Sequence, residues 1–220
     1  ALRSPERRRD LGLFAAAAGA AAVTWTVVNL PVYLRAREGW LEFFRFNLDR
    51  GVDLGSPWYA AERAWPGLLP EEVDPFVLGA AGIFLLLIVV LALTAPEPPR
   101  LAQVAFLAVA AFVLVNKVWS PQYALWLLPL AVLARPRWRD LLVWQAAEVV
   151  YFVAVWWHLA SLFEPEEPLI GDSWYALTVA LRAAGLLWVM GVVARDMLRP
   201  SMDPVRPYIE PVPPVRLSVP

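Results

Sequence analysis

Six stretches of the chain are almost wholly apolar, and polar or charged residues gather in the segments between them. A helix needs about 20 apolar residues to cross the hydrocarbon core of a bilayer, and several of these stretches approach that length. The pattern therefore predicts an all-α fold, a polytopic membrane bundle of about six transmembrane helices. The predicted spans are residues 11–34, 75–95, 101–116, 121–134, 141–160 and 174–194.

The segment 35–74, between the first two spans, has a helical pattern of its own. Apolar residues recur at helical spacing and charged residues occupy the other side, which is typical of a short helix lying in the membrane interface. Two glycines then interrupt the pattern, and Ser56-Pro57 has the residue types of an N-cap and a first helical position. We expect a second short helix that ends before Pro66. The apolar residues of the first helix are Trp40, Leu41, Phe44 and Leu48.

Composition supports the membrane class. Sixty per cent of the 220 residues are hydrophobic and 12 are Trp, which is too apolar for a soluble domain of this size. The chain has no Cys, which excludes disulfides and thiolate metal sites within it. We expect residues 1–10 to be a cytoplasmic loop of a longer protein, residues 11–194 to be the transmembrane domain, and residues 195–220 to be a Pro-rich cytoplasmic tail of irregular structure.

The arginines predict an orientation in the cell membrane. If residues 1–10 are cytoplasmic, 12 of the Lys and Arg residues outside the spans lie on the cytoplasmic side and 6 lie on the other side. This excess agrees with the positive-inside rule. The segments 35–74, 117–120 and 161–173 are then extracytoplasmic, and both ends of the chain are cytoplasmic.

The most polar interruption of an apolar region is Asn-Lys-Val-Trp-Ser-Pro-Gln-Tyr, which joins the third and fourth spans and holds Lys117, the only lysine of the chain. One interpretation is an anion- or sugar-binding turn, in which Lys117 faces a phosphate and the N–H groups of a helix beginning at Pro121 point outward. The other is an ordinary hairpin, with Lys117 snorkelling and with Trp119 and Tyr123 in the interfacial aromatic belt. The binding residues of the first interpretation are Asn116, Lys117, Ser120, Gln122 and Tyr123.

A second polar segment, residues 45–59, lies on the same predicted face. Arginine forks suit phosphate, and exposed aromatic rings can cover a sugar ring. The alternative is a charged interfacial helix whose ion pairs are solvated. The candidate ligand-binding residues are Arg45, Asn47, Arg50, Asp53, Trp58 and Tyr59.

Three ionisable residues lie within the predicted spans. Glu148 and Arg182 fall near mid-membrane on consecutive antiparallel helices, where we expect a buried ion pair that holds the helices together; a proton relay is the functional alternative. His158, at the outer end of the fifth span, is either a hydrogen-bonded interfacial residue or a group that assists at the phosphate. No metal or cofactor site is predicted, and a requirement for a divalent cation stays open.

The run from Asn116 to Leu130, Asn-Lys-Val-Trp-Ser-Pro-Gln-Tyr-Ala-Leu-Trp-Leu-Leu-Pro-Leu, resembles the C-terminal half of GT-C glycosyltransferases. It is most similar to the family 87 mannosyltransferases, which use polyprenyl-phosphate-mannose, and a similar run occurs in the catalytic subunit of the first GPI mannosyltransferase. The segment Phe44-Arg45-Phe46-Asn47, continuing through Arg50-Gly51, Asp53, Gly55-Ser56 and Trp58-Tyr59, is also similar to bacterial members of family 87. The resemblance extends over residues 11–194.

The resemblance implies a GT-C-like membrane glycosyltransferase. Such an enzyme transfers a hexose, here expected to be mannose, from a polyprenyl-phosphate-sugar donor to a lipid or glycan acceptor on the extracytoplasmic face, with inversion at the anomeric carbon. The acidic base of such enzymes usually belongs to the first extracytoplasmic loop. We therefore expect the base upstream of residue 1 and this chain alone to be inactive; Asp49 or Asp53 can contribute, but neither is assigned as the base.

Two other functions remain open. The chain can be a non-catalytic membrane scaffold or a subunit that binds lipid headgroups through its polar turn. A transporter is less favoured, because transporters tend to carry internal repeats and the octapeptide has no second copy. A membrane lipid is the expected partner in every case, and no nucleic acid is expected.

Overall fold

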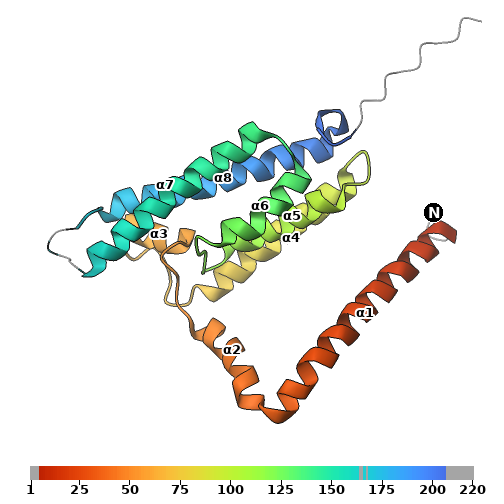
Figure 1. Ribbon diagram of the computed structural model, residues 1–220, viewed down its shortest axis with the longest axis horizontal. Coiled ribbons are helices and arrows are strands. Elements are labelled where there is room, and N and C mark those ends of the chain that lie inside the picture. The colour runs from red at the N-terminus through yellow and green to blue at the C-terminus, as the bar shows by residue number, and fades with distance from the viewer. Residues whose placement is uncertain (1–4, 164–165, 167, 207–220) are drawn as a thin grey trace, which may run out of the picture. The chain divides into compact units, whose positions relative to one another are not determined.

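The computed structural model describes residues 5–163, 166 and 168–206, with side chains from residue 12 onward. Within these residues all regular secondary structure is helical, with eight α-helices and one short 3₁₀ helix, so the predicted all-α class is confirmed. Figure 1 shows the helices in chain order. The chain divides into two units, residues 1–51 and residues 52–220.

The first unit consists of α1 (Pro5–Arg35) and α2 (Arg37–Asp49), which meet at Ala36. The junction is held by Trp40, whose indole N–H donates to the side-chain oxygen of Asn29 at 3.1 Å. The Trp40 ring also lies edge-on to Tyr33, with 5.3 Å between ring centres. α2 covers the predicted amphipathic segment, so the predicted short helix is confirmed.

The second unit begins with α3 (Pro57–Ala64), the second short helix predicted in the 35–74 segment. The hydroxyl of Ser56 accepts the backbone N–H of Tyr59 at 3.1 Å, and Pro57 occupies the first helical position. The helix ends before Pro66, as its sequence predicts. Ser56 is fully buried, so this N-cap is packed inside the second unit.

Five longer elements complete the second unit: α4 (Asp74–Thr94), α5 (Leu101–Val115), α6 (Tyr123–Ala134), α7 (Trp138–Phe163) and α8 (Asp172–Leu198). α7 packs along α8, and α5 packs against α4, α6 and α8. α7 and α8 approach closely at Gly185 of α8, where an added Cβ would lie 3.1 Å from the Cβ of Ala147 on α7. The two largest side chains of the core, Trp119 and Trp144, are fully buried.

The prediction of six full spans is wrong in number. All six predicted segments are helical, but among the described residues only four helices are long and apolar enough to cross a membrane: α1, α4, α7 and α8. α5 and α6 have 15 and 12 residues. At 1.5 Å per residue they reach about 22 Å and about 18 Å, short of the roughly 30 Å hydrocarbon core. The polar turn between them therefore lies where two short helices meet.

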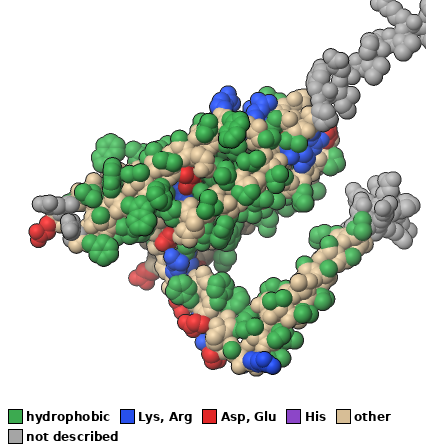
Figure 2. Space-filling model, in the orientation of Figure 1, with side chains coloured by type: hydrophobic (Ala, Val, Ile, Leu, Met, Phe, Trp, Pro, Cys, Tyr) green, Lys and Arg blue, Asp and Glu red, His purple; other side chains and the backbone are tan. Residues whose placement is uncertain are grey.

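Large hydrophobic side chains cover much of the helix surfaces in Figure 2. The exposed residues include Leu85 and Leu93 of α4, Leu125 of α6 and Phe152 of α7. In water such surfaces would be costly, whereas in a bilayer they contact lipid chains. The protein is therefore a helical membrane protein in its surface chemistry as well as in its helix lengths.

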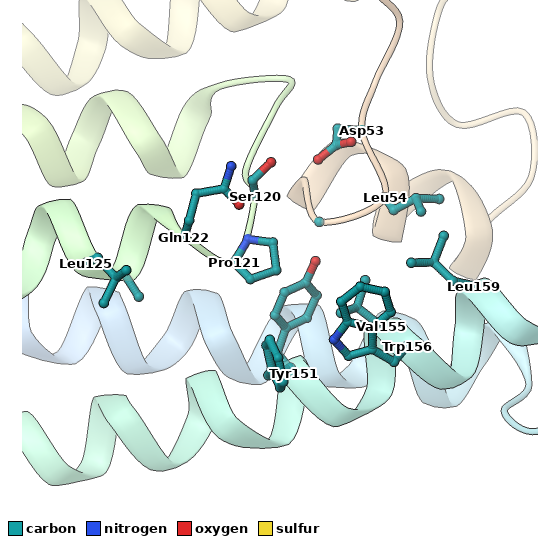
Figure 3. Close-up of a pocket in the computed structure, with 13 residues that line it drawn as sticks. Asp53, Leu54, Ser120, Pro121, Gln122, Leu125, Tyr151, Val155, Trp156 and Leu159 are labelled. Atoms are coloured by element: carbon teal, nitrogen blue, oxygen red, sulfur yellow. The ribbon is translucent and has the colours of Figure 1, made fainter.

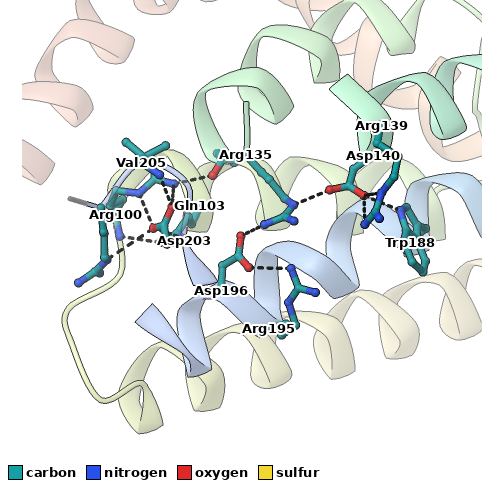
Figure 4. Close-up of polar contacts among 12 residues, drawn as sticks. Arg100, Gln103, Arg135, Arg139, Asp140, Trp188, Arg195, Asp196, Asp203 and Val205 are labelled. Carbon is teal, nitrogen blue, oxygen red and sulfur yellow. Dashed lines mark hydrogen bonds and ion pairs between the residues drawn. The ribbon is translucent and has the colours of Figure 1, made fainter. Parts of the chain in front are cut away.

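A buried ionic cluster joins the end of α6, the start of α7 and the end of α8 (Figure 4). Arg135 is almost fully buried and pairs with Asp140 at 2.7 Å and with Asp196. Nearby, Asp203 accepts from Arg100 at 2.9 Å and from Gln103 at 3.1 Å. These contacts fasten the segment that follows α8 to the start of α5. Of the predicted irregular tail, residues 195–198 continue α8, Pro200–Met202 form the 3₁₀ helix, and residues 207–220 lie outside the described part.

Candidate functional site

The predicted polar turn between α5 and α6 has a tight backbone. The side-chain oxygen of Asn116 accepts the backbone N–H of Val118 at 3.0 Å. α6 begins at Tyr123, not at Pro121. The N–H groups of residues 123–125 donate to the carbonyls of residues 120–122. The prediction of a helix end with outward-pointing N–H donors is therefore wrong for these three groups, because a 3₁₀-type turn uses them.

Lys117 lies in this turn but has a carboxylate beside it. Its ammonium is 2.7 Å from a carboxylate oxygen of Asp74 at the start of α4, and its side chain is 12% exposed. Its backbone carbonyl accepts the N–H of Asp53 at 2.7 Å. Lys117 thus ties the turn to α4 and to the segment before α3. A role for its ammonium at a phosphate stays a prediction.

Hydrogen bonds also hold the start of α3 to α5 and the segment before α3 to α8. The indole N–H of Trp58 donates to the carbonyl of Val115 at 2.8 Å, and the hydroxyl of Tyr175 on α8 donates to the carbonyl of Leu54 at 2.8 Å. Gly55 is fixed at the point of closest approach: an added Cβ would overlap the carbonyl oxygen of Trp119 and the hydroxyl of Tyr151. Only glycine fits there without a shift of backbone.

These two segments and α7 enclose a pocket of about 570 Å³ (Figure 3). This volume is within the range of small-molecule sites, roughly 300–1,000 Å³. Its polar side-chain groups come from Asp53, Ser120, Gln122 and Tyr151, and Trp156 adds an indole N–H on the α7 wall. The remaining lining residues are Leu54, Gly55, Pro121, Ala124, Leu125, Phe152, Val155 and Leu159. The pocket therefore has a polar part beside an apolar wall that α6 and α7 supply.

Arg182 lies directly behind the polar part. It is fully buried, and its guanidinium donates to Glu148 at 2.8 Å and to the carbonyls of Trp119 at 2.8 Å and Ser120 at 3.1 Å. The guanidinium carbon is 4.2 Å from the ring centres of both Trp119 and Tyr151. The predicted Glu148–Arg182 ion pair is confirmed. It also has a second effect, because the same arginine holds two pocket-lining residues, Ser120 and Tyr151.

His158 belongs to a neighbouring cluster. It is buried, shares a hydrogen bond of 2.9 Å with the hydroxyl of Tyr59, and stacks on Tyr175 with 3.9 Å between ring centres. The Tyr59 hydroxyl also accepts from Arg63 at 3.0 Å, and Arg63 pairs with Asp172 at 3.3 Å. Tyr59 and His158 are thus brought together as a hydrogen-bonded packing unit between α3, α7 and α8.

The other predicted ligand residues have local contacts of their own. Arg45 pairs with Glu38 at 2.9 Å, and the Asn47 amide donates to the carbonyl of Phe43 at 2.6 Å. Arg50 lies over the ring of Phe46, 5.8 Å from its centre. In the second unit, Tyr123 stacks on Trp126. Of the residues predicted to bind a ligand, those that line the pocket are Asp53, Ser120 and Gln122.

The α7 face of the pocket was missed by sequence reasoning. Tyr151, Val155 and Leu159 recur at a spacing of four, which predicts one side of a helix but not what that side faces. Phe152 and Trp156 repeat the same spacing one residue later. In an apolar helix such a stripe fits core, lipid and cavity equally well, so only the placement of α6 and the polar turn distinguishes them.

The described residues that line the pocket carry formal charge of one sign. Among the described residues that line it, Asp53 carries the single formal charge and no Lys or Arg contributes. The described residues contain no group of three or more His, Cys, Asp or Glu that could hold a metal ion. Comparison of the chain with family models, with curated proteins and with solved structures finds no match in any of the three.

Proposed function

We propose that the chain is the C-terminal part of a membrane glycosyltransferase. That enzyme transfers a hexose, which the resemblance suggests is mannose, from a polyprenyl-phosphate-sugar donor to a lipid or glycan acceptor on the extracytoplasmic face. One observation carries the proposal: the two segments on which the resemblance rests line a single pocket. Residues 53–55 come from the first segment, and residues 120–122, 124 and 125 come from the second.

The position of the pocket suits lipid-linked substrates. Its apolar wall includes Leu125, Phe152 and Trp156, which are 70%, 51% and 58% exposed. In a bilayer these side chains contact lipid, and α6 and α7 make few contacts with each other. An amphiphile can therefore reach the polar groups by moving sideways from the membrane, with its chain along α6 and α7.

The proposed reaction exchanges one C–O bond for another. The acceptor hydroxyl oxygen bonds to the anomeric carbon while the bond from that carbon to the polyprenyl phosphate breaks, and the electron pair leaves with the phosphate. The hydroxyl proton passes to a carboxylate base. We assign to Asp53 the role of holding a substrate hydroxyl. The base itself is assigned to the first extracytoplasmic loop that the resemblance implies.

A headgroup-binding scaffold is the second candidate, and a specific observation favours it. Lys117, the basic residue of the turn, pairs with Asp74, and no basic residue is among those described as lining the pocket. A donor phosphate would thus need a cation from elsewhere. As a scaffold, the chain would hold a lipid headgroup in the same pocket without transferring sugar.

The deciding experiment incubates membranes containing the full-length protein with labelled polyprenyl-phosphate-mannose, with and without candidate glycolipid acceptors. We expect a donor-dependent labelled product, reduced by Asp53→Asn and unaffected by Glu71→Gln, the same change on an exposed carboxylate outside the pocket. If no polyprenyl-phosphate hexose yields a product, the glycosyltransferase proposal is abandoned for the scaffold.

A further inference from the structure

The buried ionic cluster at the start of α7 and the end of α8 is an alternating chain of charges. Its contacts join, in order, Arg139, Asp140, Arg135, Asp196 and Arg195 (Figure 4). Arg135 and both aspartates are almost fully buried, whereas the side chains of Arg139 and Arg195 are 74% and 35% exposed. The chain of contacts therefore ends in a partly exposed arginine on either side, and three arginines share two carboxylates.

Two more arginines lie beside these ends. Arg137 immediately precedes α7, and Arg199 lies one turn beyond Arg195, where its backbone N–H donates to the Arg195 carbonyl at 2.8 Å. Both residues are exposed, and neither side chain makes an ion pair within the part of the chain that the structure describes. We call Arg137, Arg139, Arg195 and Arg199 the arginine rim.

The arginine rim leaves the cluster with an excess of positive charge. Together with Arg135 it places five guanidinium groups beside two aspartates, an excess of three. The neighbouring contacts do not offset this excess, because they are balanced. They pair two arginines with two acidic residues, Arg100 and Arg206 with Asp203 and Glu97.

The lengths of α7 and α8 place the arginine rim at the level of lipid headgroups. The helices have 26 and 27 residues, and at 1.5 Å per residue each is about 40 Å long, beyond the roughly 30 Å hydrocarbon core. Trp138 is 79% exposed at the start of α7, and the half-exposed Trp188 donates to Asp140 at 3.3 Å. Trp residues near helix ends are typical of the membrane interface.

The positive charge is confined to one end of this helix pair. The chain has no Lys or Arg between Asp140 and Arg182, a stretch that includes the end of α7 and the start of α8. At that opposite end, Asp172 begins α8 and pairs with Arg63 from α3. A ligand drawn by positive charge would therefore bind at the arginine rim and not at the other end of α7 and α8.

We infer that the arginine rim binds the headgroup of an anionic phospholipid. Guanidinium groups donate paired hydrogen bonds to phosphate oxygens, and each basic residue near an anionic membrane surface strengthens binding about fivefold. A zwitterionic headgroup also has a phosphate, but it carries a cation that the excess positive charge repels. This site is separate from the pocket, and it does not depend on sugar transfer.

The test compares two lipid probes with identical acyl chains and a diazirine near the glycerol, one a phosphatidylglycerol and the other a phosphatidylcholine. The full-length protein is reconstituted in phosphatidylcholine nanodiscs with a trace of either probe and photolysed, and labelled peptides are quantified by mass spectrometry. We expect the phosphatidylglycerol probe to label residues 137–142 and 195–199 about tenfold more than the phosphatidylcholine probe. Residues 157–163, at the opposite end of α7, should show no such preference.

Salt separates a lipid headgroup from a free anion. Raising NaCl from about 0.1 M to about 1 M should lower the labelling ratio severalfold, because the Debye length falls from about 10 Å to about 3 Å. Inorganic phosphate at the same ionic strength should lower the ratio no further than NaCl does. A much larger drop in phosphate would assign the arginine rim to a free phosphate and refute the lipid site.

Arg137→Gln combined with Arg199→Gln removes two of the three excess charges and leaves the buried contacts in place. We expect the labelling ratio to fall to about twofold, since one excess charge remains, and the melting temperature to stay the same. Arg35→Gln combined with Arg37→Gln is the matched control, because it removes the same charge from the first unit and should leave the ratio unchanged. Equal labelling by both probes at low salt, or an undiminished ratio in the variant of the rim, would overturn the inference.

Discussion

The guanidinium of Arg182 stacks on the ring of Trp119, 4.2 Å from its centre, and donates to the carbonyl of the same residue at 2.8 Å. Both residues are fully buried. One arginine thus fixes the side chain and the backbone of the polar turn at once. Glu148, on the neighbouring helix, supplies the compensating charge at 2.8 Å.

Arg182→Ala should destabilise the protein by about 3–5 kcal/mol, because it leaves the Glu148 carboxylate buried without its partner. Arg182→Met combined with Glu148→Gln should recover much of this loss, since no charge is then left uncompensated. Thermal unfolding in nanodiscs measures both. Hydrogen-exchange protection of the amides of residues 123–125 should fall in both variants, because the Trp119 and Ser120 carbonyls of the turn lack their donor in each. Full protection in the double variant would show that Arg182 serves the ion pair alone.

Gly55→Ala should distort the site, because its Cβ would overlap the Trp119 carbonyl and the Tyr151 hydroxyl. We expect a loss of about 1–3 kcal/mol in unfolding free energy, as for overpacked sites. Gly51→Ala is the matched control, since an added Cβ there has no atom within 4 Å. Similar melting temperatures for the two variants would contradict the close approach at Gly55.

The helices were predictable from sequence because their signals are local. Apolar runs predict the cores of α1, α4, α7 and α8, and the Ser56-Pro57 pair predicts the start of α3 through a cap that the structure contains. The number of full spans was not predictable from apolarity alone. α5 and α6 are as apolar as the long helices, and their length depends on where the polar turn folds.

The site was only partly predictable, because its geometry depends on distant residues. Asp53, Ser120 and Gln122 stand out as polar groups among apolar ones. Nothing local indicates that Asp74 lies beside Lys117 or that Tyr151 faces a cavity, since these pairings join segments far apart in the chain. Arg182 and Glu148 were paired correctly because charges within apolar helices have few stable alternatives.

The hydrogen bonds of Glu62 predict that the stability of the loop at residues 67–69 depends on pH. Hydrogen bonds from the backbone N–H groups of Gly67 and Leu69 hold the pKa of Glu62 below its ordinary value of 4.5. A lowered folded-state pKa stabilises the loop above the unfolded-state pKa, and this contribution is lost as pH falls through the folded-state value. Hydrogen-exchange protection of Gly67 and Leu69, corrected for intrinsic rates, should therefore drop as pH falls through the lowered folded-state pKa of Glu62. Glu62→Gln should abolish that pH dependence, and an unchanged profile in this variant would assign it to another group.

Lys117→Ala in the full-length protein should raise the apparent donor KM or abolish transfer while leaving membrane insertion intact, if the ammonium anchors the donor phosphate. Asp74→Asn is the informative control, because it removes the carboxylate 2.7 Å from that ammonium and leaves the charge of Lys117 in place. A phosphate anchor predicts opposite outcomes: Lys117→Ala weakens donor use, whereas Asp74→Asn leaves it unchanged or improves it, since the ammonium no longer has to leave a carboxylate. A purely structural ion pair predicts that both variants lose thermal stability together and that donor KM stays the same in each. Steady-state kinetics and melting temperatures of the two variants therefore decide whether Lys117 anchors the donor phosphate or only forms an ion pair that joins α4 to the turn.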